Sequence, residues 1–116
     1  MDSDADTTVA ALRELVARFI HERDWEQFHD PKNLSMALAT EAAELMELFR
    51  WVRNDESRDL LRDEKTFLAV RDEVADVLAF LLSFANVAEI DLAGALRDKM
   101  TRNAAKYPVE RYKGKY

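Results

Sequence analysis

Apolar residues recur every three or four positions along most of the chain, which is the spacing of one face of an α-helix. Thr7 or Thr8 can cap a first helix, because a hydroxyl oxygen accepts a bond from an unpaired helical N–H. The apolar positions of that helix are Val9, Leu12, Val16, Phe19 and Ile20. A polar and aromatic stretch follows it.

The second helix has a clear start signal. Asp30 followed by Pro31 is typical of an N-cap with proline at the first helical position. We therefore expect a helix from about Lys32 to Val52. The next segment, 53–65, is almost entirely polar and predicts a solvated connection.

Two more helices complete the predicted domain. The spacing indicates a third helix over about residues 66–88, and Asp91 can cap a fourth that ends before Pro108. The tail 109–116 is expected to be loose or to dock on a partner. The sequence thus predicts a single all-α domain, a four-helix bundle whose helical core spans about residues 7–108.

Composition and charge narrow the class of protein. The 116 residues include two Gly and two Pro, too few for the many turns of an all-β fold. Absence of cysteine excludes disulfides and thiolate-bound metal and fits a cytoplasmic protein. A net charge of −6 argues against a nucleic-acid binder. No apolar run reaches the roughly 18 residues of a membrane span, and the N-terminus lacks the pattern of a signal peptide.

Acidic residues interrupt the apolar stripe of the second helix. At about 100° per residue, Glu41 falls about 20° from Leu34, in the middle of that stripe. Glu44 lies at its edge, whereas Glu47 points toward solvent. One carboxylate is therefore predicted in the core face and a second beside it.

The third helix repeats this feature. Between residues 74 and 88 its only polar residues are Asp76, Ser83 and Asn86. A helix that is apolar almost all round must be covered on most sides, so we expect Asp76 to be shielded from bulk water. Glu73 lies one turn earlier on the same face.

Glu41-x-x-Glu44 and Glu73-x-x-Asp76 bring four carboxylates together if the two helices pack as neighbours. Four buried negative charges repel one another, and a hard divalent cation removes that cost. Neither motif contains His or Cys, so Mg²⁺, for which Mn²⁺ can substitute, is preferred over Zn²⁺. The alternative is a buried acid network that shares protons.

The fourth helix carries the opposite charge. Lys99, Asn103 and Lys106 follow the i, i+4, i+7 spacing on the side of Leu92 and Leu96. They can hold phosphate oxygens. Equally, the two lysines can extend past apolar neighbours into water.

Aromatic residues offer surfaces for stacking a nucleobase. The candidates are Trp25, Phe28, His29, Trp51 and Phe80. Phe80 lies one turn after the predicted metal face. Aromatic residues at helix ends are more often core or interface residues, and His29 can also be a surface loop residue.

The order of these motifs resembles the MazG-like all-α nucleoside triphosphate pyrophosphohydrolases, in which such acid pairs bind metal. The similarity spans about Leu12 to Pro108 and is most detailed with the dCTP pyrophosphatase branch. The segments that carry it are Glu22 to His29, Asn33-Leu34, Trp51, Lys99-Met100, Asn103 and Tyr107-Pro108.

This resemblance implies hydrolysis of dCTP or a modified dCTP to dCMP and pyrophosphate, a reaction of nucleotide-pool sanitation. It also implies a homotetramer built as a dimer of dimers. The implied roles are metal binding by Glu41, Glu44, Glu73 and Asp76, base binding by Trp25 and Trp51, and triphosphate binding by Lys99 and Asn103.

Two positions depart from the animal enzymes of that branch. Val16 stands where they carry His, and Phe80 where they carry Tyr. Both changes remove polar groups near the nucleotide, so the choice of base and sugar is open. From the chemistry of the site, we expect Glu41 or Glu44 to activate the attacking water and Lys99 or Lys106 to stabilise the departing pyrophosphate.

Three other functions fit parts of the pattern. The chain could be a non-catalytic helical interaction module, with the apolar third helix as its interface. It could perform the same reaction on another dNTP. A di-iron carboxylate bundle is disfavoured, because such sites use Glu-x-x-His pairs and no His follows these acids at that spacing.

Overall fold

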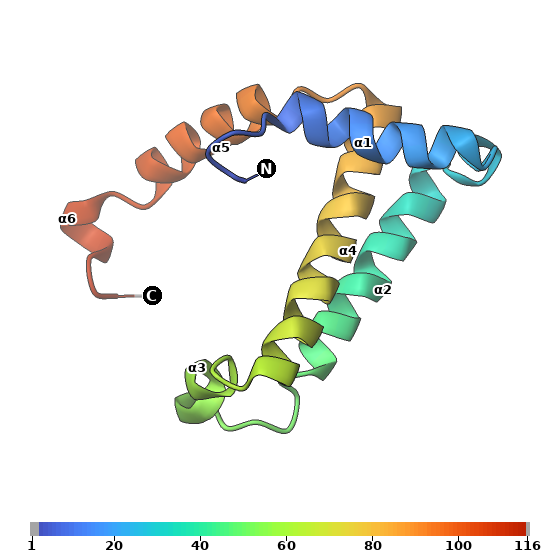
Figure 1. Ribbon diagram of the computed structural model, residues 1–116. Helices are drawn as coiled ribbons and strands as arrows, with labels where there is room; N and C mark the ends of the chain where they lie inside the picture. The colour runs from blue at the N-terminus through green and yellow to red at the C-terminus, as the bar shows by residue number, and fades with distance from the viewer. Residues whose placement is uncertain (1–2, 116) are drawn as a thin grey trace.

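The computed structural model describes residues 3–115, all of whose regular elements are helices (Figure 1). The two longest, α2 and α4, lie side by side, and α1 crosses them near one end. In chain order the elements are α1 (Val9–Glu22), η1 (Glu26–Phe28), α2 (Pro31–Glu47), η2 (Asn54–Glu56), α3 (Ser57–Leu60), α4 (Glu64–Ala88), α5 (Leu92–Lys106) and α6 (Val109–Tyr112).

Side-chain caps fix where three of the helices begin. Thr8 Oγ1 accepts a bond from Ala11 N at 3.0 Å, and Asp91 Oδ2 accepts one from Gly94 N at 3.0 Å, which confirms both predicted caps. Asp63 caps α4 in the same way. At α2, Pro31 occupies the first turn as predicted.

The buried core is small and lies between α2 and α4. Leu34 of α2 is 2 % exposed, and it shares the core with Leu82, Ser83 and Ala85 of α4. The hydroxyl of Ser83 donates to Ala79 O at 2.9 Å, so this buried polar group is satisfied within its own helix. The core therefore consists mainly of one helix pair.

The predicted end of α2 was too late, and the segment after it is more ordered than expected. Regular α-helix stops at Glu47, after which tighter turns continue through Val52, with bonds such as Val52 N to Phe49 O at 3.0 Å. Between Arg53 and Asp63 the chain forms η2 and α3 rather than an irregular connection.

The fourth long helix does not close a bundle within one chain. Glu89 adopts a left-handed conformation, φ 55°, and the chain leaves α4 so that α5 lies at 100° to it. In Figure 1, α5 extends away from the α2–α4 pair and ends in the short helix α6. The all-α class is confirmed, but among the long helices of residues 3–115 the extensive contacts are those that α2 and α1 make with α4.

This arrangement leaves the chain open in shape. Its radius of gyration is 17.2 Å, against about 13 Å for a compact domain of similar length. Its accessible surface is 9818 Å², against about 6,500 Å² for a folded monomer of this mass. Apolar side chains of α5 such as Leu96 and Met100 are exposed. A single chain therefore leaves much apolar surface in contact with water.

Two remaining observations concern the ends and the hydropathy of the helices. The predicted loose tail is helical at Val109–Tyr112, and its last residue, Tyr116, lies outside the described range. Within residues 3–115, no single helix meets the length and hydropathy of a membrane span, although α4 and α5 taken together do.

Candidate functional site

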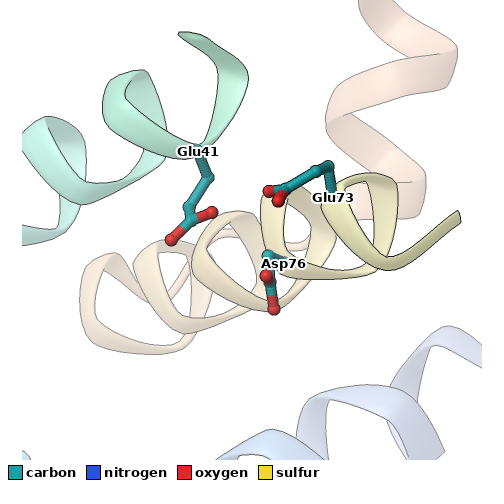
Figure 2. A group of neighbouring side chains, drawn as sticks. All are labelled: Glu41, Glu73 and Asp76. Carbon is teal, nitrogen blue, oxygen red and sulfur yellow. The ribbon is translucent and has the colours of Figure 1, made fainter. Parts of the chain in front are cut away.

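Three carboxylates meet where α2 and α4 face each other (Figure 2). Glu41 comes from α2, and Glu73 and Asp76 come from successive turns of α4. One oxygen of each lies within 4.8 Å of the others. The packing of the two helices thus brings together acids that lie more than 30 positions apart in the sequence.

Two oxygens of this acid cluster have nothing to bond. Among the described residues, Glu41 Oε2 and Glu73 Oε2 are buried and have no hydrogen-bond partner. An unpaired buried carboxylate oxygen is unfavourable. The cluster therefore has unused acceptor capacity directed into the protein.

The shared environment changes the acidity of two of the groups. Hydrogen bonding to Glu44 is the main cause that raises the pKa of Glu41 to about 7, and burial and the charges of Glu44 and Asp76 act in the same direction. Burial, followed by the charge of Glu44, raises the pKa of Glu73. Both carboxyl groups therefore hold their protons more tightly than in water, through hydrogen bonding to Glu44 for Glu41 and burial for Glu73, with the neighbouring negative charges adding to both.

The fourth predicted acid lies at the rim of this cluster. Glu44 is exposed, yet it interacts with both Glu41 and Glu73. Glu47, predicted to face solvent, is exposed and pairs with Arg50 at 3.0 Å. Of these two glutamates of α2, Glu44 thus lies beside the cluster and Glu47 faces solvent, as the helical spacing indicated.

One prediction about burial was wrong. Asp76 is exposed rather than shielded from water. The prediction expected cover either from within the bundle or from another subunit, and within the chain α5 leaves at 100° and does not supply it. In one chain, the flank that carries Asp76 remains open.

The donor set fits a hard divalent cation. All its ligand atoms are carboxylate oxygens, which Mg²⁺ and Mn²⁺ prefer. A cation here would satisfy the two unpaired oxygens and offset the mutual repulsion that raises the pKa values. The open flank at Asp76 leaves room for water or for a second anion.

The predicted aromatic residues are not gathered in one place. Trp25 and His29 lie before α2, at the end where it meets α1, whereas Trp51 follows the opposite end of α2 and is 82 % exposed. A helix of 17 residues is about 25 Å long, so one base cannot touch both tryptophans of a single chain. Phe80 is half-buried, one turn beyond Asp76 on α4.

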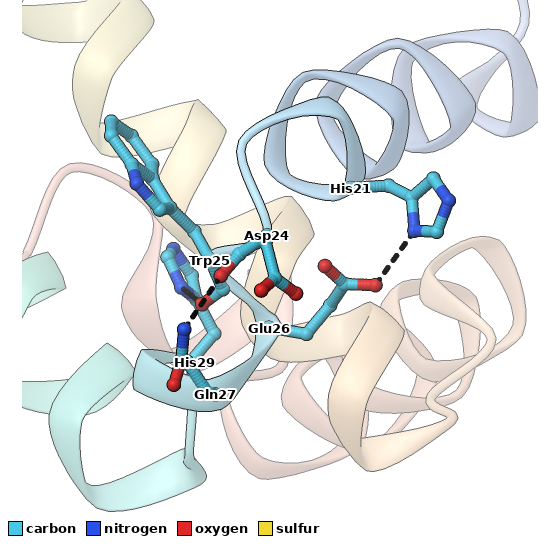
Figure 3. Close-up of polar contacts among 6 residues, drawn as sticks. All are labelled: His21, Asp24, Trp25, Glu26, Gln27 and His29. Carbon is cyan, nitrogen blue, oxygen red and sulfur yellow. Dashed lines mark hydrogen bonds and ion pairs between the residues drawn. The ribbon is translucent and has the colours of Figure 1, made fainter.

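Backbone contacts hold the Trp25–His29 turn in shape (Figure 3). His29 Nδ1 lies 2.7 Å from Trp25 O, and Trp25 N donates to Ile20 O at 3.1 Å. His21 contacts Glu26 at 2.8 Å across the same turn. The indole of Trp25 packs edge-on against Phe19, with ring centroids 5.8 Å apart. This turn is therefore attached to the end of α1.

A cavity of about 440 Å³ lies beside this turn. Its walls come from α1, from the C-terminal half of α4 and from the turn itself, with Ile20, His29, Ser83 and Asn86 among its lining residues. The volume lies within the range of small-molecule pockets. Of the predicted aromatic residues, His29 lines it, and Trp25, Trp51 and Phe80 do not.

The predicted cationic residues lie on α5. Lys99 and Lys106 are exposed, Asn103 is half-buried, and the Lys106 ammonium stands 5.3 Å from the centre of the Tyr107 ring. Because α5 projects away from the α2–α4 pair, one chain does not place this helix over its own acid cluster.

The sequence pattern gave no role to Arg13. Its guanidinium donates from Nε to Asn86 Oδ1 at 2.9 Å and from Nη2 to Ala85 O at 3.1 Å. Asn86 was noticeable only as a polar residue in an apolar helix, and periodicity alone could not identify its partner 73 positions earlier.

Comparisons with known proteins agree with this picture. The model of the MazG nucleotide pyrophosphohydrolase domain matches residues 29–113. The chain is 40% identical over 109 residues to dCTP pyrophosphatase 1 of Rattus norvegicus and 40% identical over 104 residues to that of Homo sapiens. These matches cover 94% and 90% of the chain but only 64% and 61% of the two relatives.

A solved structure matches along nearly its whole length. A pyrophosphatase from Archaeoglobus fulgidus superimposes with a TM-score of 0.81 at 37% identity, over 93% of this chain and 99% of that one. The helical arrangement described above is thus shared with an experimentally determined protein of similar size.

Proposed function

Because the chain belongs to the MazG nucleotide pyrophosphohydrolase family, we propose that it hydrolyses a nucleoside triphosphate to the monophosphate and pyrophosphate. The acid cluster of Glu41, Glu73 and Asp76 is the observation that carries this proposal. Relatives named dCTP pyrophosphatase favour dCTP or a modified dCTP as substrate. The corresponding role is sanitation of the nucleotide pool.

Glu41, Glu44, Glu73 and Asp76 are the proposed ligands of Mg²⁺, with Mn²⁺ as a substitute. When bound, the cation neutralises charge on the triphosphate oxygens and offsets the charge that grows during phosphoryl transfer. The two unpaired buried oxygens and the all-oxygen donor set support this assignment.

The carboxylates also act on the attacking water. Glu41 or Glu44 orients the water, or accepts a proton from it, as the water oxygen attacks the α-phosphorus. The bond between the α-phosphorus and the oxygen that bridges to the β-phosphorus breaks, and pyrophosphate leaves. Lys99 or Lys106 stabilises the charge of the leaving group.

The base is proposed to lie near the turn that joins α1 to α2. Trp25 and His29 belong to this turn, and His29 lines the cavity beside it. Phe80 lies between the acid cluster and this cavity along α4, since Asp76 precedes it and Ser83 follows it. A nucleotide that reaches from the acid cluster to this cavity would contact both α1 and α4.

The remaining proposed contacts, from Trp51, Lys99, Asn103 and Lys106, require another copy of the chain. Trp51 lies at the far end of α2, and α5 projects away at 100°. The large exposed surface and the extended shape support the same conclusion. We propose a homo-oligomer, a tetramer formed as a dimer of dimers, in which one copy supplies the acids and another the cationic helix.

The direct test is a panel of dNTPs and NTPs, including 5-substituted dCTP, with Mg²⁺ and with EDTA. The expected products are the monophosphate and pyrophosphate, and dCTP or a modified dCTP is turned over fastest. Release of orthophosphate in place of pyrophosphate would place the cleavage elsewhere.

Glu41→Gln tests the role of the cluster in the same assay. It keeps the shape of the side chain but removes the charge, so turnover should fall by about a hundredfold or more. Glu47→Gln, a solvent-facing glutamate on the same helix, should leave turnover unchanged. Full Mg²⁺-dependent turnover by Glu41→Gln would remove the basis of the proposal. Lack of any nucleotide hydrolysis by the wild type would favour a helical interaction module.

A further inference from the structure

A reciprocal polar contact fastens α1 to the C-terminal end of α4. The Arg13 guanidinium donates to Asn86 Oδ1, to Ala85 O and to Ile90 O, and Asn86 Nδ2 donates back to Arg13 O at 3.1 Å. The bonds from Arg13 to Asn86 Oδ1 and to Ala85 O use a charged donor in a half-buried position, where hydrogen bonds are stronger than at an exposed surface. We call the Arg13–Asn86 contact the latch.

Few other interactions hold α1. All of α1 lies within the described part of the chain, and no residue of α1 is fully buried. Its main packing partner is α4, since neither α2 nor α5 makes extensive contact with it. Because the apolar residues Leu12, Val16 and Ile20 are only half-buried, directional bonds contribute a larger share of the orientation of α1.

The latch connects the two halves of the proposed nucleotide site. Trp25 is bound to the end of α1 through Ile20 O and through its edge contact with Phe19, and His29 is bound to Trp25 O. At the other side, α4 carries Glu73 and Asp76. The turn is also attached to α2, where Asn33 donates to Phe28 O at 3.3 Å. The position of α1 on α4 therefore contributes, together with α2, to where the aromatic turn lies relative to the acid cluster.

The latch also borders the cavity between these helices. Asn86 lines the cavity, and so do Ser83 of α4 and Ala17 and Ile20 of α1. If the guanidinium were lost, Asn86 would keep only its bond to the backbone oxygen of Arg13, and α1 would be held less firmly against α4. The width of the cavity depends on the position of α1 on α4.

We propose that Arg13 and Asn86 are positioning residues for the nucleoside part of the substrate. Arg13 acts through α1, Asn86 holds it from α4 and also lines the cavity, and neither residue touches the phosphates or a metal ligand. This proposal rests on the proposed function, because it assigns the cavity and the aromatic turn to the nucleoside.

The test compares Arg13→Ala and Asn86→Ala with the wild type in steady-state kinetics on dCTP. Loss of positioning should raise KM about tenfold, which equals about 1.4 kcal/mol, with a smaller change in kcat. Mn²⁺ affinity, measured by titration without nucleotide, should stay within about twofold of wild type because the acids remain in place. A general loss of structure would instead weaken Mn²⁺ binding and lower kcat as well.

Two further variants distinguish the loss of the Arg13–Asn86 contact from the general effect of removing a side chain. Asn86→Asp keeps the acceptor for Arg13 Nε but loses the amide donor to Arg13 O, so its KM should lie between those of Asn86→Ala and the wild type. Arg62→Ala removes an exposed arginine that pairs only with Asp59 and should change nothing. The double variant Arg13→Ala/Asn86→Ala should lose less than the sum of the two single losses, because both single variants remove the bond from Arg13 Nε to Asn86 Oδ1.

Hydrogen exchange gives a readout that needs no activity. Amides of residues 9–29 should exchange faster in Arg13→Ala than in the wild type, while those of α2 near Glu41 should not. Unchanged exchange together with unchanged KM would overturn the latch even if the wild type hydrolyses dCTP. A wild type that hydrolyses no nucleotide would overturn the proposed function, while the exchange result would still report on the latch.

Discussion

Glu41 shows how a single residue determines the character of the site. Its carboxylate lies on the apolar face of α2, where an ordinary bundle has leucine, and one of its oxygens has no partner among the described residues. Hydrogen bonding to Glu44, burial, and the charges of Glu44 and Asp76 make its ionisation unfavourable. This residue therefore couples the stability of the fold to pH and to cations.

The metal-free protein should lose stability as the pH rises from about 4.5 to 7. In the unfolded chain Glu41 ionises near its ordinary pKa of 4.5, whereas in the folded chain its pKa is raised to about 7. Between these values the unfolded state releases its proton first, so the stability is present at low pH and is lost as the pH passes 7. Thermal unfolding in EDTA at pH 5, 6, 7 and 8 measures this fall in Tm.

Mg²⁺ should reverse the trend, because a cation binds the ionised carboxylates and so raises Tm more at pH 8 than at pH 5. Glu41→Gln isolates the contribution of this residue, since the raised pKa values of Glu73 and His21 act in the same direction. The variant should show a shallower fall than the wild type. A Tm in EDTA that rises between pH 5 and 7 would contradict the prediction.

Among single residues, the sequence predicted the position of Glu41 on the apolar face of α2 better than it predicted what surrounds the acid cluster. The position of Glu41 followed from helical periodicity, because Leu34 and its neighbours define the face that meets α4. The exposure of Asp76 could not be predicted, because it depends on where α5 lies and not on the helix that carries Asp76. Arg13 was missed for a similar reason, since its partners are 72 to 77 positions away.

At the scale of elements, helix starts were the most predictable feature. Thr8 and Asp91 were identified as caps because their side-chain chemistry is local. Helix ends were less predictable, because α2 changes to tighter turns after Glu47 without a glycine to mark the change. The short helices between Arg53 and Asp63 lack an apolar stripe that periodicity could detect.

The cationic face of α5 yields a prediction of its own. Lys99→Ala removes a proposed phosphate contact and should lower kcat/KM about tenfold or more. Arg97→Ala is the matched control, because this exposed arginine lies on the same helix two positions away and so points to another side. Steady-state kinetics on dCTP compare the two. Equal losses would show that only the net charge of α5 matters.

For the whole molecule, the fold class was predicted correctly but its closure within one chain was not. Periodicity shows that α5 has an apolar side, with Leu96 at 64 % exposure, yet it does not show whether the same chain or another one covers it. The extended shape favours another copy. Sedimentation should therefore give a mass above 13.4 kDa, the mass of one chain.

Mixing two inactive variants tests whether copies share a site. Glu41→Gln has a defective acid cluster, and Lys99→Ala/Lys106→Ala lacks the two lysines of the cationic face of α5. If one copy supplies each part, random mixing creates intact sites in about one quarter of cases, because half of the pairs are mixed and one of their two sites is complete. Activity after joint refolding measures this recovery. Activity no higher than the sum of the separate variants would show that each chain completes its own site.

The left-handed residue between α4 and α5 has a geometric consequence. With 15 residues, α5 is a rigid arm about 22 Å long, and its direction is set largely by the backbone dihedrals of Glu89 and the two residues after it. A rotation of about 10° at this hinge would move the far end of the arm by about 4 Å, roughly the spacing of neighbouring strands in a sheet. Substitutions at the hinge should therefore change the reach of the arm toward the proposed second subunit while every side chain proposed to contact the nucleotide stays the same.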